Sequence, residues 1–327
     1  MSTTVLANRY NVLRNTVNNV LGPSGVYAPS YGYGQAFSTN AVVGTRTSAT
    51  PAAASKVTAQ DYEDLYIDLI RVRSHQVGPA VAIDEFVIGN YNTNTATADK
   101  IEESYILGLE SLGNNITGDR LLVYPTHLTI QGLATANSTR SASSTWQGTI
   151  STIFTTTFTS ALQRRHFFNA GGQIRLSASV NYTGSQAKTV DWQTVLNAMG
   201  STSFKAETTS NNAGVGTGSS IGNYDLTTSY QLVYSRSGGS VYARNRYNVY
   251  AKEHATGNAT SAIQFKVDFV DGLPNDTTWG IDETVSGTFN SIVETATPSS
   301  EISINGTIHN AVVSNNPITG ALISALS

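Results

Sequence analysis

Apolar residues recur at helical spacing in the first third of the chain. One stripe predicts a helix over residues 3–21, ended by Gly22-Pro23, and a second predicts a helix that begins at Thr58 and stops near His75–Gly78. A third helix is expected over Asp99–Ser111, ended before Gly113 and Gly118, and a strand over Leu121–Ile130. The members of the first two stripes are Leu6, Tyr10, Leu13, Val17, Val20, Tyr62, Leu65, Leu69 and Val72.

The first two stripes match each other at an offset of 52 residues. Ala7 and Ala59 correspond, as do Tyr10 and Tyr62, so the pattern A-x-x-Y-x-x-L occurs twice. A shared amphipathic face explains the apolar matches, but it does not require the same Ala and Tyr. Two explanations remain open: an internal duplication, or two helices that pack in the same way against a common partner.

After Trp146 the pattern changes to short alternating segments, which are typical of strands. One short helix is expected over Val190–Met199, with Asp191 near its start as a candidate cap. Strands at this spacing favour a sandwich over βαβ units. The expected strands are 147–160, 173–181, 203–208, 225–235, 244–252, 262–270, 284–293 and 301–309.

The whole pattern predicts an α+β protein, with an N-terminal helical docking region followed by a mainly antiparallel β-sandwich-like domain. The Thr/Ser/Asn-rich segment Ala134–Ser144 is the best candidate boundary. It gives an N-terminal helical and extended assembly region over 1–140 and a β domain over 141–327.

The stretch Thr149–Val180 is the most informative segment. Alternating residues on both sides of Gly171-Gly172 predict a strand, a corner and a second strand rather than a helix. At least one of the two glycines is expected to have a positive φ. His166, just before Phe167-Phe168, is expected to hydrogen-bond a backbone group.

Composition excludes several classes of protein. Charged residues are only 13% of the chain, the net charge is −3, and the 19 Lys and Arg form no basic stripe, so direct nucleic-acid binding is not expected. The chain has no cysteine, which excludes disulfides and thiolate–metal sites. The first residues lack the charged and apolar regions of a secretory signal, and no apolar run is long enough to span a bilayer.

One loop is a candidate calcium site. Asp268, Asp271, Asp276 and Asp282 gather around Gly272-Leu273-Pro274, and hard cations prefer several oxygen ligands on a flexible loop. The spacing is not that of an EF-hand, and Asp is also common in loops as a backbone cap. The favoured interpretation is that these residues form a structural loop. No cofactor is expected.

Catalytic patterns are not evident. The sequence has no G-x-S-x-G elbow, P-loop or dinucleotide fingerprint. Pairs of carboxylates are too common in the chain to single out a glycoside hydrolase. The chain is therefore not expected to be an enzyme.

Several segments resemble a family of virion structural proteins of tailed bacteriophages, especially cyanophages and related aquatic phages with contractile tails. They are LANRYNVLRNTVNNVLG followed by YGYGQ, VTAQDYEDLYIDLIRVRSHQVG, TFTSALQRRHFFNAGGQIRLSASV with DWQTVLNAMGS, and IGNYDLTTSYQLVYS, and they follow the family's order. The most specific unit is Phe167, Phe168, Asn169, Gly171 and Gly172, followed by Asp191 and Trp192. The resemblance implies membership of a virion but no position in the particle.

The leading hypothesis is a non-enzymatic virion component (capsid, neck, tail, baseplate or fibre) that is made in the host cytoplasm. Its partners would be copies of itself and other virion proteins, with no membrane or direct nucleic-acid partner. A second hypothesis is a glycan-binding host-receptor module of a tail or neck fibre. A third, a glycan-cleaving depolymerase, lacks the long β-helical repeats that such enzymes usually carry. The expected assembly interface is Tyr10, Leu13, Val17, Tyr62, Leu65 and Leu69.

Overall fold

The computed structural model describes most of the chain and groups it into two compact units. The first unit comprises Met1–Thr129, Arg165–Gly171 and Thr297–His309, and the second comprises Ile130–Arg164, Gly172–Ala296 and Asn310–Ser327. The expected boundary after residue 140 stays a prediction. The described residues are 3–22, 32–34, 57, 59–78, 103–132, 138–139, 144–254, 261–273, 284–298, 311–315 and 319–323.

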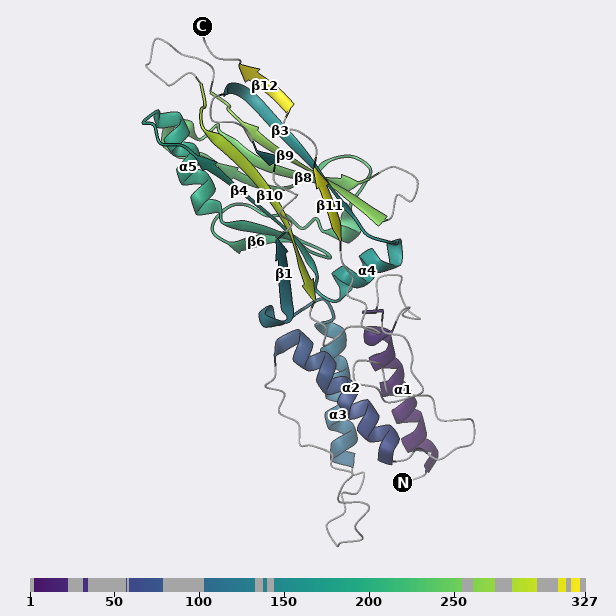
Figure 1. Cartoon of the computed structure of the whole chain (residues 1–327). Coiled ribbons are helices and arrows are strands. Elements are labelled where there is room, and N and C mark those ends of the chain that lie inside the picture. The colour runs from purple at the N-terminus through teal and green to yellow at the C-terminus, as the bar shows by residue number, and fades with distance from the viewer. Residues whose placement is uncertain are drawn as a thin grey trace. The chain divides into compact units, whose positions relative to one another are not determined.

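The chain is α+β, with N-terminal helices followed by a β-rich region that contains two sheets, as predicted (Figure 1). The described helices are α1 (Thr3–Leu21), α2 (Ala59–Val77), α3 (Glu103–Gly118), α4 (Ala161–Asn169) and α5 (Ala187–Met199), with short 3-10 turns at Pro125–His127, Asn223–Asp225 and Ser240–Tyr242.

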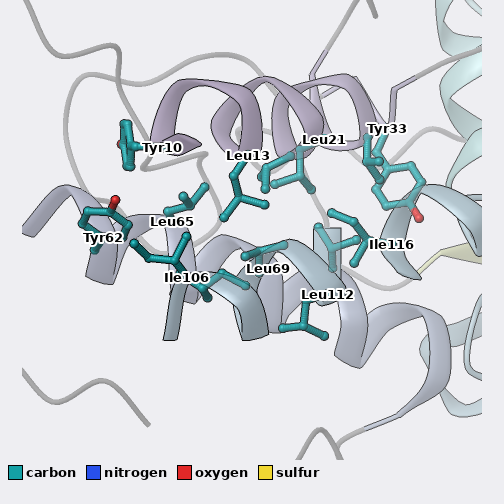
Figure 2. Packing of buried hydrophobic residues seen from close by; sticks show 14 of the residues in the cluster. Tyr10, Leu13, Leu21, Tyr33, Tyr62, Leu65, Leu69, Ile106, Leu112 and Ile116 are labelled. Carbon is teal, nitrogen blue, oxygen red and sulfur yellow. The ribbon is translucent and has the colours of Figure 1, made fainter. Parts of the chain in front are cut away.

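The first unit contains a bundle of α1, α2 and α3. Their apolar stripes face one another, and the core that they form includes Leu13, Leu65 and Ile116, which are at most 4% exposed (Figure 2). Burial of such side chains stabilises each helix by about 1.5–3 kcal/mol per residue, which isolated helices of this length need.

The three helices run in the same direction. Near their first turns, the Tyr10 and Tyr62 rings are in contact and Arg9 pairs with Glu103 and Glu110. Near their last turns, Arg73 pairs with Asp119. A helix of 19 residues such as α1 is about 28 Å long. The first turns of the three helices lie at one end of the bundle, and their last turns lie at the other.

Helix α3 is longer than predicted, because Gly113 does not end it. Gly113 is buried in the middle of α3, where a Cβ would lie 2.7 Å from Leu13 Cδ1. The absence of a side chain at Gly113 leaves room for Leu13 of α1, and α3 ends at Gly118. The start predicted at Asp99 lies outside the described residues.

The second unit contains two sheets with antiparallel pairing at every described register. The first sheet has the order β1-β10-β4-β5-β6, with β2 also paired to β10, and the second has the order β11-β3-β9-β8-β7, with β12 also paired to β3. The strands are β1 (Leu128–Gly132), β2 (Ser138–Thr139), β3 (Thr145–Thr157), β4 (Gln173–Asn181), β5 (Ser201–Phe204), β6 (Thr209–Ala213), β7 (Gln231–Ser237), β8 (Arg246–Glu253), β9 (Ala262–Val270), β10 (Thr288–Pro298), β11 (Val312–Asn315) and β12 (Thr319–Ile323).

Aromatic rings from the two sheets pack edge to face against one another in the core between the sheets. Phe204 of β5 meets Phe265 of β9 with ring centroids 5.1 Å apart, and Phe289 of β10 meets Phe269 of β9 at the same distance. Trp192 of α5 packs against both Phe269 and Phe289 and is fully buried. The sandwich core is therefore closed by α5 as well as by the two sheets.

Residues 161–169 form helix α4, so the predicted corner at this place is wrong. Ser160 caps the helix, because its Oγ accepts a hydrogen bond from the backbone N–H of Gln163 at 3.1 Å. Gly171, with φ of +84°, ends it in the left-handed conformation expected of a C-terminal glycine. The expectation of a positive φ at one of the two glycines is thus confirmed at Gly171, and the flanking strands β3 and β4 are where they were predicted.

Other strand boundaries differ because of neighbours remote in sequence. The predicted strand 121–130 is irregular at first and then forms the 3-10 turn Pro125–His127, so β1 starts only at Leu128. Strand β6 pairs with β5, and β11 and β12 pair in succession with β3; none of the three was predicted. The predicted strand 301–309 lies outside the described residues.

Candidate ligand-binding face

The outer surface of the second sheet carries a group of polar side chains arranged in rows. Alternate residues of β8 and β9 face the sandwich core and are buried, including Val249, Phe265 and Val267. The residues between them lie on the other face, which we call the outer face. Cross-strand pairing places these outward residues in regular rows across β7, β8, β9 and β3.

Two tyrosines and two lysines form the centre of the outer face. Lys252 Nζ lies 4.5 Å from the centroid of the Tyr230 ring, and Lys266 Nζ lies 4.5 Å from the centroid of the Tyr250 ring. Lys266 Nζ is also 5.5 Å from the Tyr230 ring centroid. Contacts of this kind hold an ammonium group over a ring and contribute about 0.5–1 kcal/mol at exposed sites. The two cations are therefore held in place without being removed from water.

Hydrogen bonds hold the hydroxyl groups of Tyr230 and Tyr250 in place. The Tyr230 hydroxyl donates to Gln264 Oε1 at 2.9 Å, and Asn248 Nδ2 donates to the Tyr250 hydroxyl at 3.4 Å. Asn248 Oδ1 in turn accepts from Ser235 Oγ at 2.7 Å. Partial burial, and then the nearby Asp268 carboxylate, raise the pKa of Tyr230, so its hydroxyl stays protonated and remains a donor.

The outer face carries more positive than negative charge. Arg246, Lys252 and Lys266 all occupy outward positions of β8 and β9, and Asp268 is the acidic residue at the outward positions of these strands. Asp268 is already engaged, because it accepts from Ser151 Oγ at 2.7 Å and pairs with Lys266 Nζ at 2.9 Å. Neither Arg246 nor Lys252 has an ion pair among the described residues. The face can therefore bind an anionic group beside neutral hydrogen-bonding groups.

The predicted assembly interface is not on the surface. The six residues are buried inside the bundle of the same chain, at 5% exposure or less, so they are not available to a partner. The apolar stripes of α1 and α2, which were expected to need partner proteins, are covered by each other and by α3. The residues concerned are Tyr10, Leu13, Val17, Tyr62, Leu65 and Leu69.

The residues of the Phe-Phe-Asn-x-Gly-Gly unit have structural roles. Phe167 and Phe168 are fully buried and pack edge to face at 5.1 Å, and Asn169 Nδ2 donates to the Gly32 carbonyl at 3.0 Å. His166 Nδ1 lies 3.3 Å from the same carbonyl, in agreement with the expected backbone contact. A Cβ on Gly171 would lie 2.5 Å from Val123 Cβ, so this position has no room for a side chain.

Asp191 does not cap α5, contrary to prediction. The helix begins at Ala187, and Asp191 lies one turn inside it. Its carboxylate instead accepts a hydrogen bond from the backbone N–H of Gly239 at 3.0 Å, and partial burial raises its pKa. The sequence could not show this contact, because Gly239 is far from Asp191 in the chain.

Two of the four calcium candidates have cationic partners. Asp268 pairs with Lys266 on the outer face, whereas Asp271 pairs with Lys188 at 3.1 Å in the interior, where both side chains are fully buried. Asp276 and Asp282 lie outside the described residues. Within the described ranges, no group of three or more His, Asp or Glu residues is placed to hold a metal ion.

The outer face was not predicted as a site, although the sequence contains a signal for it. Tyr250-x-Lys252 and Gln264-x-Lys266-x-Asp268 alternate with buried residues, so these side chains had to share one face of their strand. The missing information was the register of β8 against β9. That register places Tyr250 opposite Lys266 and Lys252 opposite Gln264.

No family model matches the chain, and no curated protein or solved structure gives a significant match. In the described part of the chain, no helix is long and apolar enough to cross a membrane.

Proposed function

We propose that the chain is a non-enzymatic structural component of a tailed-phage virion. The observation that carries the proposal is where the segments that resemble the virion family lie. They supply Tyr10, Leu65, Phe168 and Trp192, all of which belong to the buried parts of the two units. The resemblance therefore involves the residues that determine the architecture, as expected if architecture is what the chain shares with that family.

Buried ionisable groups support a structural role. Arg164 pairs with Glu253 and donates from Nε to Asn223 Oδ1 at 2.6 Å, and Lys188 pairs with Asp271. His75 lies with Nε2 2.9 Å from the Ala170 carbonyl. Each of these groups joins segments that are distant in sequence, which is how charged and polar groups stabilise an interior.

Assembly contacts on the helical unit would have to use its outer surface, since the inner stripes are buried. Val12 of α1 and Leu107 of α3 are large apolar side chains that are 60% and 54% exposed. We propose that docking uses such outward positions of the helices, and that the β unit packs against copies of itself or projects from the particle.

A density map of the purified particle, with this subunit carrying a fused label, tests the proposal. We expect the label at symmetry-related positions, with density beside it that accommodates a two-sheet domain. Label found at random or missing from intact particles, although the fusion protein is expressed and folded, would contradict virion membership.

The outer face favours a second candidate function, a glycan-binding module that contacts a host receptor. Tyr230 and Tyr250 stand on one exposed sheet face with amide and hydroxyl groups around them, which is a composition suited to sugars. This function is compatible with a position on a fibre, and an array of host-derived glycans tests it.

A further inference from the structure

We infer that the outer face binds a linear polysaccharide with carboxylate-bearing sugar residues. This inference rests on the glycan-binding candidate function, and it names the chemical class of the ligand. The face is defined by the outward residues of β7, β8, β9 and β3, with the Tyr230–Lys252 and Tyr250–Lys266 pairs at its centre.

The charge of the face selects an anion. The whole chain has a net charge of −3, yet the outward positions of β8 and β9 carry three cations and one carboxylate. Lys266 is neutralised by Asp268, and Lys252 and Arg246 remain as cations without an ion pair among the described residues. A local excess of positive charge on an acidic protein attracts anionic ligands.

The spacing of the two cations favours a polymer. Arg246 and Lys252 lie on the same strand at positions that share one face, and a strand rises about 3.3 Å per residue, so their Cα atoms are about 20 Å apart. A single sugar cannot reach both. An extended chain with acidic groups at intervals can lie along β8 and contact Arg246, the Tyr250–Lys266 pair and Lys252 in succession.

The groups between the cations favour carbohydrate over an acidic peptide or a nucleic acid. Gln264 and Ser235 carry amide and hydroxyl groups, which match sugar hydroxyls, and Leu232 is 46% exposed beside them. Asn248 is buried below them, where it bonds Ser235 and Tyr250. A nucleic acid presents closely spaced phosphates and requires clustered cations. Here the cations are few and are separated by neutral polar groups, as expected for a polymer of neutral and acidic sugars.

Binding of the full chain to three uronate polymers (polygalacturonate, alginate and hyaluronan), each compared with its neutral methyl ester, tests the inference. We expect at least one uronate polymer to bind, its ester to bind more weakly, and added salt to weaken the acidic form selectively. Lys252→Gln should lower the affinity by about fivefold, and adding Arg246→Gln should lower it further. Arg71→Gln, on α2, removes one charge elsewhere and should leave the affinity unchanged.

The contrary outcomes are distinct. Equal binding of acid and ester would overturn the acidic ligand and keep the glycan-binding function. If no polymer binds, the inference fails, and an array of host glycans then decides whether the broader function survives. If Lys252→Gln, with unchanged melting temperature and circular dichroism, binds as tightly as the parent chain, the outer face is not the site. None of these results bears on whether the chain is part of a virion.

Discussion

Tyr10 and Tyr62 are 52 residues apart in the chain and pack edge to face in the bundle, with ring centroids 5.2 Å apart. They are also the matching tyrosines of the repeated A-x-x-Y-x-x-L pattern. The match therefore corresponds to a real spatial equivalence, because α1 and α2 run in the same direction and place equivalent residues at the same level. Both helices pack against α3, in agreement with the explanation that invoked a common partner. An internal duplication stays a hypothesis.

Truncation of a side chain in the bundle core should destabilise the helical unit. Leu65 is fully buried, and Leu65→Ala should lower the free energy of unfolding by about 2–5 kcal/mol through lost contacts and a cavity. Leu107→Ala, at a position that is 54% exposed, is the matched control and should change stability by less than about 0.5 kcal/mol. Denaturant titration followed by circular dichroism measures both. Equal effects of the two changes would show that the bundle does not form as described.

A side chain at Gly171 should be costly. The position has φ of +84°, and a Cβ there would lie 2.5 Å from Val123 Cβ. Gly171→Ala should cost at least about 1–2 kcal/mol for the left-handed backbone alone, before the collision is counted. Gly108→Ala, where nothing lies within 4 Å of the added Cβ, should stabilise α3 by about 0.5–1 kcal/mol. Thermal melting compares the two variants, and a neutral Gly171→Ala would argue against this turn.

The buried Lys188–Asp271 pair should be sensitive to the loss of one partner. Both side chains are fully buried, so Lys188→Met leaves a carboxylate in the interior without its cation and should cost about 3–5 kcal/mol. The double change Lys188→Met with Asp271→Leu removes both charges and should recover most of that loss. A double-mutant cycle by chemical denaturation checks this. If the double variant is as unstable as the sum of the single ones, the pair has no coupling.

Stability should fall between about pH 6.5 and pH 4 because of His75. Burial, opposed by the contact with the Ala170 carbonyl and helped by His127, lowers the pKa of His75 to about 4 in the folded chain, whereas the unfolded value is about 6.5. The unfolded state therefore binds the proton first, and up to about 3 kcal/mol of stability is lost as the pH falls through this window. His75→Gln should make the unfolding free energy less dependent on pH between 7 and 4.5. An unchanged pH profile in that variant would show that another group is responsible.

The sequence predicted elements well where one face of the element is buried over its full length. Helices α1 and α2 and strands β3, β4 and β9 have regular stripes, and their observed bounds agree closely with the predicted ones. Helix α4 was missed because its buried residues include polar ones, Arg164 and Asn169, which carry no apolar periodicity. They are buried because partners distant in sequence, such as Glu253 and Gly32, satisfy them. The Ser160 cap and the Gly171 end were the signals that could have located the helix.

The candidate site depended on information that one strand cannot carry. Lys252 and Lys266 are ordinary outward residues in isolation, and only the pairing of β8 with β9 brings both to the tyrosines. The prediction of the assembly interface was wrong for a different reason. A single helix cannot show whether its apolar face is covered by another protein or by later helices of its own chain. In this chain, the apolar faces of α1 and α2 are covered by each other and by α3.

The central proposal is that the chain is a fixed part of a tailed-phage virion. Quantitative mass spectrometry of particles of a tailed phage that carries this sequence, purified on a density gradient and washed in high salt, tests it most directly. The account predicts that peptides of both units remain in the particle fraction at a constant ratio to the major capsid protein. Loss of the chain in the wash, or its recovery only in the unbound lysate fraction at a variable ratio, would contradict it.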